Sequence, residues 1–216
     1  MTYAVKEIYF TVQGEGMNTG QPAVFCRFAG CNLWSGLEVD RASAICDFCD
    51  TDFVGTDGPG GGKFQSAMDL ASAIKACWQE NPLKEKPAAE PFVVCTGGEP
   101  LLQLDETLIE AIHNAGLKLA IETNGTLPAP KNVDWICVSP KAQTDLKQVS
   151  GDELKFIYPQ KNIEPEQFEH LEFNHFLLQP MDDDNHPLNT ERALAYCQAH
   201  PHWQLSVQTH KYLGLP

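Results

Sequence analysis

The fold of this chain is most constrained by its short apolar runs, each of which is followed by polar or turn residues. Short apolar runs bounded by such residues are typical of buried strands. The runs cover residues 23–28, 92–96, 118–122, 135–139, 154–158, 176–179 and 205–208. We therefore expect these segments to form the sheet of the fold.

Helical patterns lie between several of the predicted strands. Apolar residues recur at helical spacing within 67–78, 101–115 and 193–197. Ser66 is the predicted cap of the first helix, and Gly116 is the predicted end of the second. The third is predicted to begin at Asn189 or Thr190. The connections 135–154 and 158–176 show little helical pattern.

Strands that alternate with helices indicate a mainly parallel sheet. A complete eight-unit barrel needs about 250 residues, whereas this chain has 216. Its few helical patterns also fall short of eight. We predict an α/β fold with a single domain spanning 1–216. Its architecture would be a partial, open (β/α) barrel of about six mainly parallel strands with few helices.

Polar motifs follow four of the predicted strands, at residues 96–100, 122–126, 139–141 and 179–182. The carboxyl ends of parallel strands meet at one edge of a sheet or barrel, where ligands bind. The sequence therefore predicts that these motifs form one site. The glycine-rich segment 55–62 is interpreted as a mobile loop.

Composition limits the class of protein. The net charge of −14 makes nucleic acid an improbable partner, because phosphate binding favours basic proteins. No apolar run approaches the roughly 18 residues of a membrane span, and no export signal precedes the first strand. We expect a cytoplasmic protein without disulfides. Among its eight cysteines, Cys77, Cys137 and Cys197 fit buried apolar positions.

Three other cysteines, Cys31, Cys46 and Cys49, have the spacing C-x14-C-x2-C. Thiolates at short spacing bind zinc or iron–sulfur clusters. Structural zinc usually has four protein ligands, and Cys26 is a poorly placed fourth because it lies inside a predicted strand. Three ligands suit a 4Fe–4S cluster with one open iron. The spacing alone leaves both alternatives open.

The motif Thr96-Gly97-Gly98-Glu99-Pro100 leaves a predicted strand and enters a helical pattern. Glycines let a ligand approach the backbone, and a carboxylate accepts hydrogen bonds from an ammonium group. Taken alone, the motif is equally well explained as a tight turn with Glu99 near a helix start. The segment 139–141 alone is likewise explained as a strand end with a surface lysine.

Together these motifs resemble the radical S-adenosylmethionine (SAM) superfamily and, most closely, its 7-carboxy-7-deazaguanine synthase family. The resemblance extends from Thr11 to Pro216, and Phe48 stands at the aromatic position of the superfamily motif. A 14-residue first gap is a known variant within this family. The resemblance implies that Cys31, Cys46 and Cys49 hold a 4Fe–4S cluster whose fourth iron binds SAM.

The resemblance also implies which residues bind SAM. The glycine motif would receive the methionine ammonium group, and the backbone after Cys46 would meet adenine. The segment 139–141 would supply a hydroxyl and a cation, and 179–182 would close over the nucleoside. The implied SAM contacts are Phe48, Cys49, Asp50, Gly97, Gly98, Glu99, Ser139, Pro140, Lys141, Gln179, Pro180, Met181 and Asp182.

The implied substrate is 6-carboxy-5,6,7,8-tetrahydropterin. Arginine can hold a carboxylate by two parallel hydrogen bonds, and apolar neighbours favour an inward Arg27, although it could instead pair a structural acid. The terminal carboxylate would bind the aminopyrimidinone edge. The implied substrate contacts are Val12, Gln13, Gly14, Glu15, Arg27, Thr96, His210 and Pro216.

Magnesium binds hard oxygen ligands and keeps several waters. From the residues alone, Asp50 would be the better magnesium ligand and Thr51 a turn residue. The resemblance instead assigns Mg²⁺ to Thr51, together with the substrate carboxylate and water.

The implied reaction is a radical SAM-dependent and Mg²⁺-dependent ring contraction that gives 7-carboxy-7-deazaguanine and ammonia, in queuosine or 7-deazapurine biosynthesis. Implied partners are a one-electron donor such as flavodoxin or ferredoxin and a second copy of the chain in a homodimer.

Two other functions stay open: an activase that makes a glycyl radical on a partner protein, and a zinc-stabilised binding module. Residues 13–16 and Arg27 argue against the activase.

Overall fold

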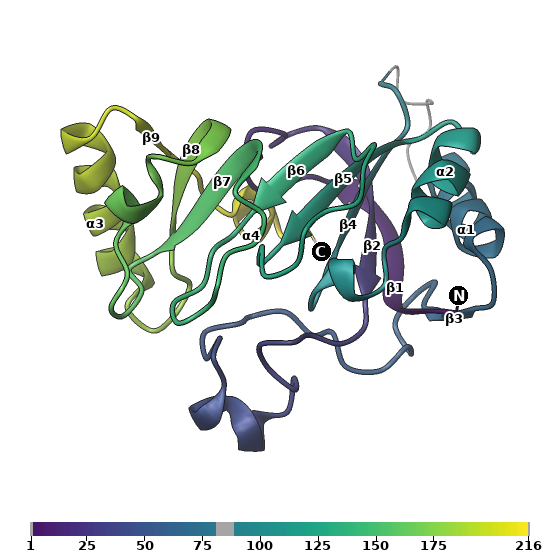
Figure 1. The fold of residues 1–216 in the computed structure, drawn as a ribbon, viewed down its shortest axis with the longest axis horizontal. Helices are drawn as coiled ribbons and strands as arrows, with labels where there is room; N and C mark the ends of the chain where they lie inside the picture. The colour runs from purple at the N-terminus through teal and green to yellow at the C-terminus, as the bar shows by residue number, and fades with distance from the viewer. Residues whose placement is uncertain (1, 81–88, 216) are drawn as a thin grey trace.

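The computed structural model describes residues 2–80 and 89–215. Within these residues, nine strands form one sheet in the order β3-β1-β2-β4-β5-β6-β7-β8-β9 (Figure 1). The strands are β1 (Tyr3–Val12), β2 (Pro22–Phe28), β3 (Gly62–Phe64), β4 (Phe92–Gly97), β5 (Lys118–Thr123), β6 (Trp135–Val138), β7 (Ser150–Tyr158), β8 (Glu172–Pro180) and β9 (Trp203–Leu205).

The helices are few, as predicted, and lie mostly at the two ends of the sheet (Figure 1). The α-helices are α1 (Ala67–Gln79), α2 (Glu106–Asn114), α3 (His186–Ala199) and α4 (Thr209–Leu213). Short 3-10 helices are η1 (Glu38–Ser43), η2 (Pro100–Leu102) and η3 (Pro165–Phe168). No helix of the described residues is long and apolar enough to cross a membrane.

The sheet is mainly parallel and open. From β2 through β4 to β9, each neighbouring pair of strands runs parallel, whereas β1 pairs antiparallel with both β2 and β3. The sheet ends at β3 and β9, which do not pair with each other. The prediction of a partial, open barrel is confirmed, with seven parallel strands among the described residues.

Two strands escaped the sequence analysis. In β1, Lys6 and Glu7 interrupt the apolar pattern, because one part of this strand faces a loop and another faces the cavity described below. The edge strand β3 has three residues and no buried side chain. The predicted strand 205–208 was misplaced, since β9 ends at Leu205 and α4 follows shortly afterwards.

Helix α1 follows its sequence pattern closely. Its buried residues form the predicted stripe, and the Ser66 hydroxyl accepts a hydrogen bond from Asp69 N at 3.1 Å. The second predicted helix is divided into η2 and α2, because the Asp105 carboxylate caps a new helix by accepting from Leu108 N at 2.9 Å. Helix α3 begins at His186, before the predicted start at Asn189 or Thr190.

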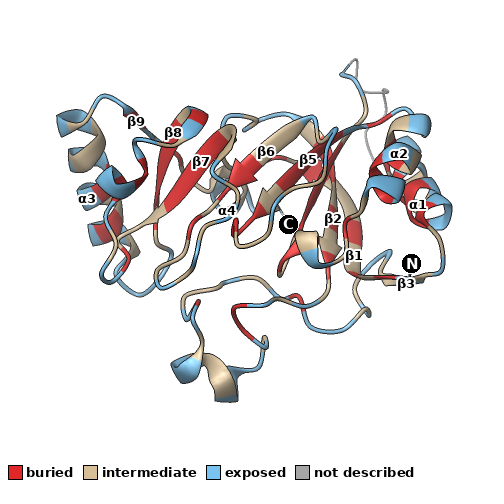
Figure 2. Cartoon of the chain, in the orientation of Figure 1, coloured by how far each residue is buried: buried red, intermediate tan, exposed pale blue. Residues whose placement is uncertain are grey.

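The two faces of the sheet differ in character. The side chains of the outer face pack against α1 and α2 at one end and against α3 and η3 at the other, forming two buried apolar clusters. Figure 2 shows these strands and the inward sides of the helices as buried. On the inner face, Arg27, Thr96, Glu122 and Lys155 alternate with the apolar residues of the same strands.

The glycine-rich segment is fixed against β1, so its interpretation as a mobile loop was wrong. Ile8 N donates to Pro59 O at 2.8 Å, and Gly58 N donates to Lys6 O at 3.0 Å. A Cβ atom on Gly61 would lie 2.1 Å from Lys6 O. Glycine is therefore required here for close backbone packing.

Two helical leucines give a direct test of this core. Leu108 in α2 is fully buried, whereas Leu194 in α3 is 44% exposed. We expect Leu108→Ala to lower the free energy of unfolding by about 2–5 kcal/mol and Leu194→Ala by less than about 1 kcal/mol. Urea denaturation measures both, and equal losses would contradict the described packing.

Candidate active site at the carboxyl ends of the strands

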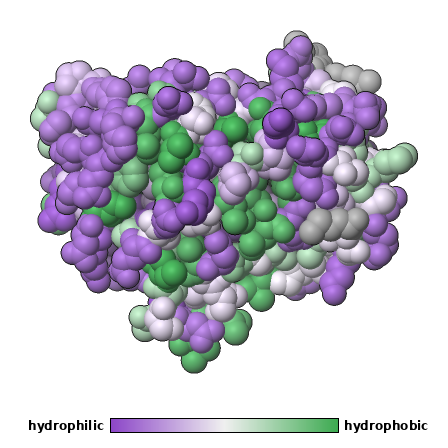
Figure 3. Space-filling view, in the orientation of Figure 1, coloured by the Kyte–Doolittle hydropathy of each residue, from purple (hydrophilic) through white to green (hydrophobic). Residues whose placement is uncertain are grey.

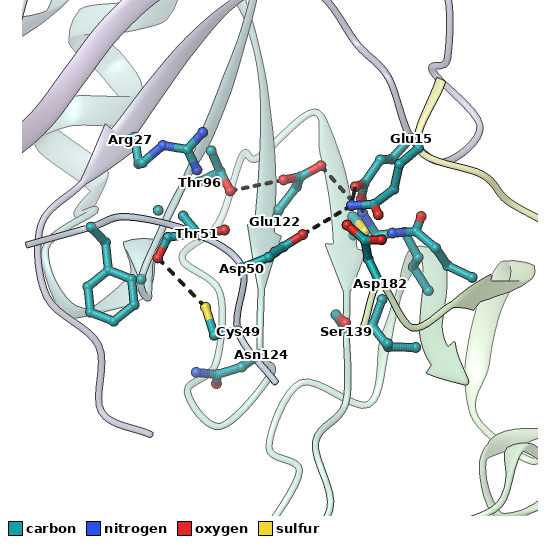
Figure 4. A pocket seen from close by; sticks show the side chains of 18 of the residues that line it. Glu15, Arg27, Cys49, Asp50, Thr51, Thr96, Glu122, Asn124, Ser139 and Asp182 are labelled. Atoms are coloured by element: carbon teal, nitrogen blue, oxygen red, sulfur yellow. Dashed lines mark hydrogen bonds and ion pairs between the residues drawn. The ribbon is translucent and has the colours of Figure 1, made fainter. Parts of the chain in front are cut away.

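A cavity of about 380 Å³ lies over the inner face and the carboxyl ends of the parallel strands. Figure 4 shows Arg27, Thr96 and Glu122 from the strands around the same space as Cys49 and Thr51 from the loop after β2. Nearly all of the predicted site residues line this cavity. The exceptions are Glu99 and Pro140, which do not line it, and Pro216, which lies outside the described residues.

The three cysteines of the C-x14-C-x2-C motif line the cavity as free thiols. Leu33 N donates a hydrogen bond of 3.4 Å to the sulfur of Cys31. Burial raises the pKa of the Cys31 thiol, and it raises the pKa of Cys46 to about 11. Both thiols are therefore protonated at neutral pH until a metal displaces the proton.

The three thiols can be compared with the ligand sets of two kinds of metal site. Among the described residues, no three His, Cys, Asp or Glu side chains are grouped closely enough to hold one ion. A structural zinc ion needs all its ligands in one coordination sphere. In an iron–sulfur cluster each cysteine binds a different iron. All three thiols line one cavity, so they could bind separate irons of one cluster.

Arg41 organises the 14-residue gap between Cys31 and Cys46. It donates to the main-chain oxygens of Asp47 at 2.9 Å and Cys49 at 3.0 Å. Its guanidinium lies 4.1 Å from the centroid of the Trp34 ring. The gap is thus an ordered loop, and one cation holds the turn that carries the last two cysteines.

This loop projects from the sheet and carries exposed apolar side chains. Figure 1 shows it below the strands, and Figure 3 shows hydrophobic residues at its lower tip. Leu37, Val39 and Ile45 are exposed, and Ile45 directly precedes Cys46. An apolar surface therefore lies beside a predicted cluster ligand.

Gly97 and Gly98 pack against the end of β2, where no side chain would fit. A Cβ atom on Gly98 would lie 2.1 Å from Gly30 O, and one on Gly97 would lie 2.3 Å from Phe28 O. Glu99 N donates to Gly30 O at 2.9 Å. The glycine motif thus exposes its backbone to the cavity and holds the turn that precedes the first cysteine.

The Glu99 carboxylate is fully buried behind this backbone. It accepts hydrogen bonds from Thr123 Oγ1 at 2.8 Å, Asn124 N at 2.8 Å and Leu101 N at 3.0 Å. Burial raises its pKa despite these donors. Its side chain therefore joins the end of β5 to the start of η2, and the cavity wall at this point is the backbone of Gly97 and Gly98.

Ser139 and Lys141 lie together beside Phe48. Lys141 Nζ donates to Ser139 O at 2.8 Å and to Ser139 Oγ at 2.6 Å, and it lies 5.9 Å from the centroid of the Phe48 ring. Burial lowers the pKa of Lys141. The carbonyl of Pro140 accepts from Gln160 Nε2 at 3.2 Å. The backbone at Pro140 thus supports the turn, while its two neighbours face the cavity.

Helix α4 closes one side of the cavity. Lys211 pairs with Asp50 at 2.7 Å and with Asp182, so it connects the loop that carries the three motif cysteines (the cysteine loop) to the end of β8. His210 packs so closely on Gly14 that a Cβ atom there would lie 2.2 Å from His210 Nδ1. The predicted residues near the C-terminus therefore meet the predicted N-terminal segment.

The segment after β1 brings Gln13 and Glu15 to the inner face. Gln13 Nε2 donates to Glu122 Oε1 at 3.2 Å, and Glu15 pairs with Lys155 and accepts from Gln208 Nε2 at 2.8 Å. Burial by itself would raise the pKa of Glu15, but the Lys155 ammonium outweighs it and lowers the pKa to about 2. Glu15 is therefore ionised throughout the neutral range.

Arg27 points inward, and it also pairs an acid, so both interpretations of this residue hold. Its Nε donates to Glu7 Oε1 at 2.8 Å and its Nη2 to Tyr9 Oη at 2.9 Å. Its Nη1 makes no hydrogen bond to a described residue. Arg27 lines the cavity together with Thr51 and Thr96.

Sequence reasoning missed Lys155 as a site residue, and it placed Glu122 in the site only as part of the polar motif 122–126. Both line the cavity, and Glu122 accepts from Thr96 Oγ1 at 2.9 Å. Each is a charged residue within a predicted apolar strand, at 118–122 and 154–158. Charged residues are rarely buried without a partner, so this interruption was the available signal.

The chain is similar over nearly its whole length to known proteins. The chain is 60% identical to the 7-carboxy-7-deazaguanine synthase of Caulobacter vibrioides and 59% identical to that of Bordetella pertussis, over the full length of each chain. It is also similar to the structure titled "Crystal structure of QueE from Escherichia coli", with a TM-score of 0.70 and 27% identity over 97% of this chain and 95% of that one. No protein-family model matches.

The identity of these relatives over their full length, together with the shared fold, establishes the family and its enzymatic character. The chain belongs to the 7-carboxy-7-deazaguanine synthase family.

Proposed function

We propose that this chain makes 7-carboxy-7-deazaguanine from 6-carboxy-5,6,7,8-tetrahydropterin, with release of ammonia, by radical SAM chemistry that depends on Mg²⁺. The observation that carries the proposal is the placement of three thiols and an inward arginine around one cavity. A cluster side and a carboxylate-binding side thereby face the same space. Family membership supplies the product.

Cys31, Cys46 and Cys49 would hold the 4Fe–4S cluster. When bound, the cluster and SAM supply the radical that removes a hydrogen atom from the substrate. The chain itself orients the two ligands and limits the access of water. Arg41 supports the cluster side by fixing the backbone of the turn between Cys46 and Cys49.

SAM would lie between the glycine motif and the end of β8. The backbone at Gly97 and Gly98 offers carbonyl oxygens to its ammonium group, while Ser139 and Lys141 offer a hydroxyl and a cation. Phe48 to Asp50 and Gln179 to Asp182 supply the walls. Because its carboxylate is occupied by three internal donors, Glu99 would contribute through its backbone and by holding this turn.

The substrate would occupy the inner face of β2, β4 and β5. Arg27 Nη1 would bind the 6-carboxylate, which would share Mg²⁺ with the Thr51 hydroxyl. Thr96 and the segment from Val12 to Glu15 would contact the ring, and His210 would lie behind it. The assignment of Pro216 to the substrate stays a prediction.

The remaining partners belong to the same proposal. A one-electron donor such as flavodoxin or ferredoxin would reduce the cluster, and the exposed apolar side chains beside Cys46 offer a place for it. The chain would work in the cytoplasm as a homodimer. The family resemblance supports the dimer.

The decisive experiment is anaerobic turnover. Protein reconstituted with iron and sulfide is incubated with SAM, reductant, Mg²⁺ and 6-carboxytetrahydropterin, and product is read by mass spectrometry. We expect 7-carboxy-7-deazaguanine and ammonia. A colourless protein that binds zinc and no iron would overturn the proposal in favour of a zinc-stabilised module.

Cys49→Ala tests the cluster assignment. Because three thiolates are needed to hold the cluster, we expect this variant to lose most of its iron, its absorption at about 400 nm and its ability to cleave SAM. Cys77→Ala is the matched control, since Cys77 lies in α1 and does not line the cavity. SAM cleavage by the Cys49→Ala protein at the unsubstituted rate would rule out this ligand set.

Arg27→Gln tests the carboxylate site. Loss of a charge-assisted hydrogen bond should raise KM for the carboxypterin about 10- to 100-fold, while SAM affinity stays unchanged. Steady-state kinetics and SAM titration measure the two quantities. A comparable loss of SAM affinity would show that the substitution disturbs the whole cavity and that Arg27 does not select the substrate.

A further inference from the structure

Lys155 is a buried cation shared by two carboxylates of the cavity wall. It lies in β7 with 7% of its side chain exposed, pairs with Glu15 and lies 3.7 Å from Glu122 Oε1. Three distant segments therefore meet at one ammonium group: the turn after β1, the end of β5 and the middle of β7.

Stability alone does not explain this lysine. Removing an ammonium group from water is costly, and well-packed apolar residues usually replace a buried ion pair at little or no loss. Apolar residues occur at neighbouring inner-face positions, as at Ile157 on β7 and Leu177, which pairs with Lys155 on β8. The charge at position 155 is therefore better explained by what it does to the two carboxylates.

Both carboxylates are held at several points and still reach the cavity. Glu122 accepts from Gln13 and Thr96, and Glu15 accepts from Gln208. Their side chains keep 21% and 17% exposure, and both line the cavity. A carboxylate has about four acceptor positions, so each retains capacity for a ligand donor. The wall thus presents fixed hydrogen-bond acceptors to the cavity.

We propose that Lys155 is a positioning residue that holds Glu15 and Glu122 as ionised acceptors for the ring N–H groups of the pterin. This inference rests on the proposed function and names the part of the site that recognises the ring. A reduced pterin carries several N–H donors, and Arg27 is placed to bind the anionic end of the same molecule. The two carboxylates therefore select a ring rich in donors.

The same geometry predicts a change in pH dependence. The charged and titratable groups that face Lys155 are Glu15, Glu122, Cys137 and Lys141. With Lys155 present, the pKa of Glu15 is about 2, so its charge does not vary near neutrality. Without the ammonium group, burial would raise the pKa of Glu15. Its ionised form, and ring binding with it, would then be lost as the pH falls.

The test measures binding of 6-carboxy-5,6,7,8-tetrahydropterin, by anaerobic isothermal titration calorimetry, to protein reconstituted with cluster, SAM and Mg²⁺, without reductant so that no turnover occurs. We expect Lys155→Met to weaken binding about 10- to 100-fold, with SAM affinity unchanged within about twofold. Binding should weaken further from pH 8 to pH 6 in this variant and stay level in the unsubstituted protein. Lys147→Met is the control, because Lys147 is exposed and pairs with Asp145 at the surface.

Two further variants separate positioning from folding. Lys155→Met/Glu15→Gln removes both charges, so it should fold and bind the carboxytetrahydropterin weakly with no pH dependence between 6 and 8. Glu122→Gln keeps the shape of Glu122 and should weaken pterin binding about 10-fold. Thermal unfolding confirms that each variant is folded, and Glu122→Gln carries the test if Lys155→Met does not fold.

Each outcome has one meaning. Unchanged pterin affinity in Lys155→Met or in Glu122→Gln overturns the positioning role alone. Equal losses of pterin and SAM affinity overturn it as well, since they indicate general damage to the cavity. Failure of the unsubstituted protein to bind 6-carboxy-5,6,7,8-tetrahydropterin overturns the proposed function and this inference together.

Discussion

The site depends on a sheet whose outer face is apolar and whose inner face carries charged side chains toward the carboxyl ends of its strands. Helices α1, α2 and α3 cover the outer face, so the core forms there and leaves the inner face free for chemistry. Buried polar groups must be paired. On the inner face Arg27 pairs with Glu7, and Lys155 pairs with Glu15. The cavity walls are therefore charged and also rigid.

Close backbone contact joins the two motifs that sequence analysis treated separately. Gly98 lies so near Gly30 O that any side chain would displace the turn before Cys31. Buried Glu99 ties the same turn to the end of β5. The glycine motif therefore has two roles: it exposes backbone to the cavity, and it fixes where the cysteine loop begins. An ordinary strand-to-helix turn would need neither Gly98 nor a fully buried carboxylate such as that of Glu99.

Much of the fold could be predicted because apolar periodicity and strand ends are local signals. The parallel strands, helix α1 and the meeting of motifs at the carboxyl ends followed from them. Strand β1 did not, because its adjacent charged residues, Lys6 and Glu7, serve partners distant in sequence, such as Asp57 for Lys6. The three-dimensional pairing of Lys155 with Glu15 and Glu122 was also hidden, since Lys155 and Glu122 look like exceptions within their own strands and Glu15 lies far from both in sequence.

An open half-barrel leaves its cavity exposed where further strands would stand in a closed one. In this chain short irregular segments take that position. The cysteine loop covers one side, ordered by Arg41, and α4 covers another. Lys211 joins the two through Asp50 and Asp182. Because this bridge is partly exposed, it is weaker than the buried pair at Lys155. The cavity is thus rigid at its base and held by weaker contacts at its mouth, the arrangement expected where ligands must enter and leave.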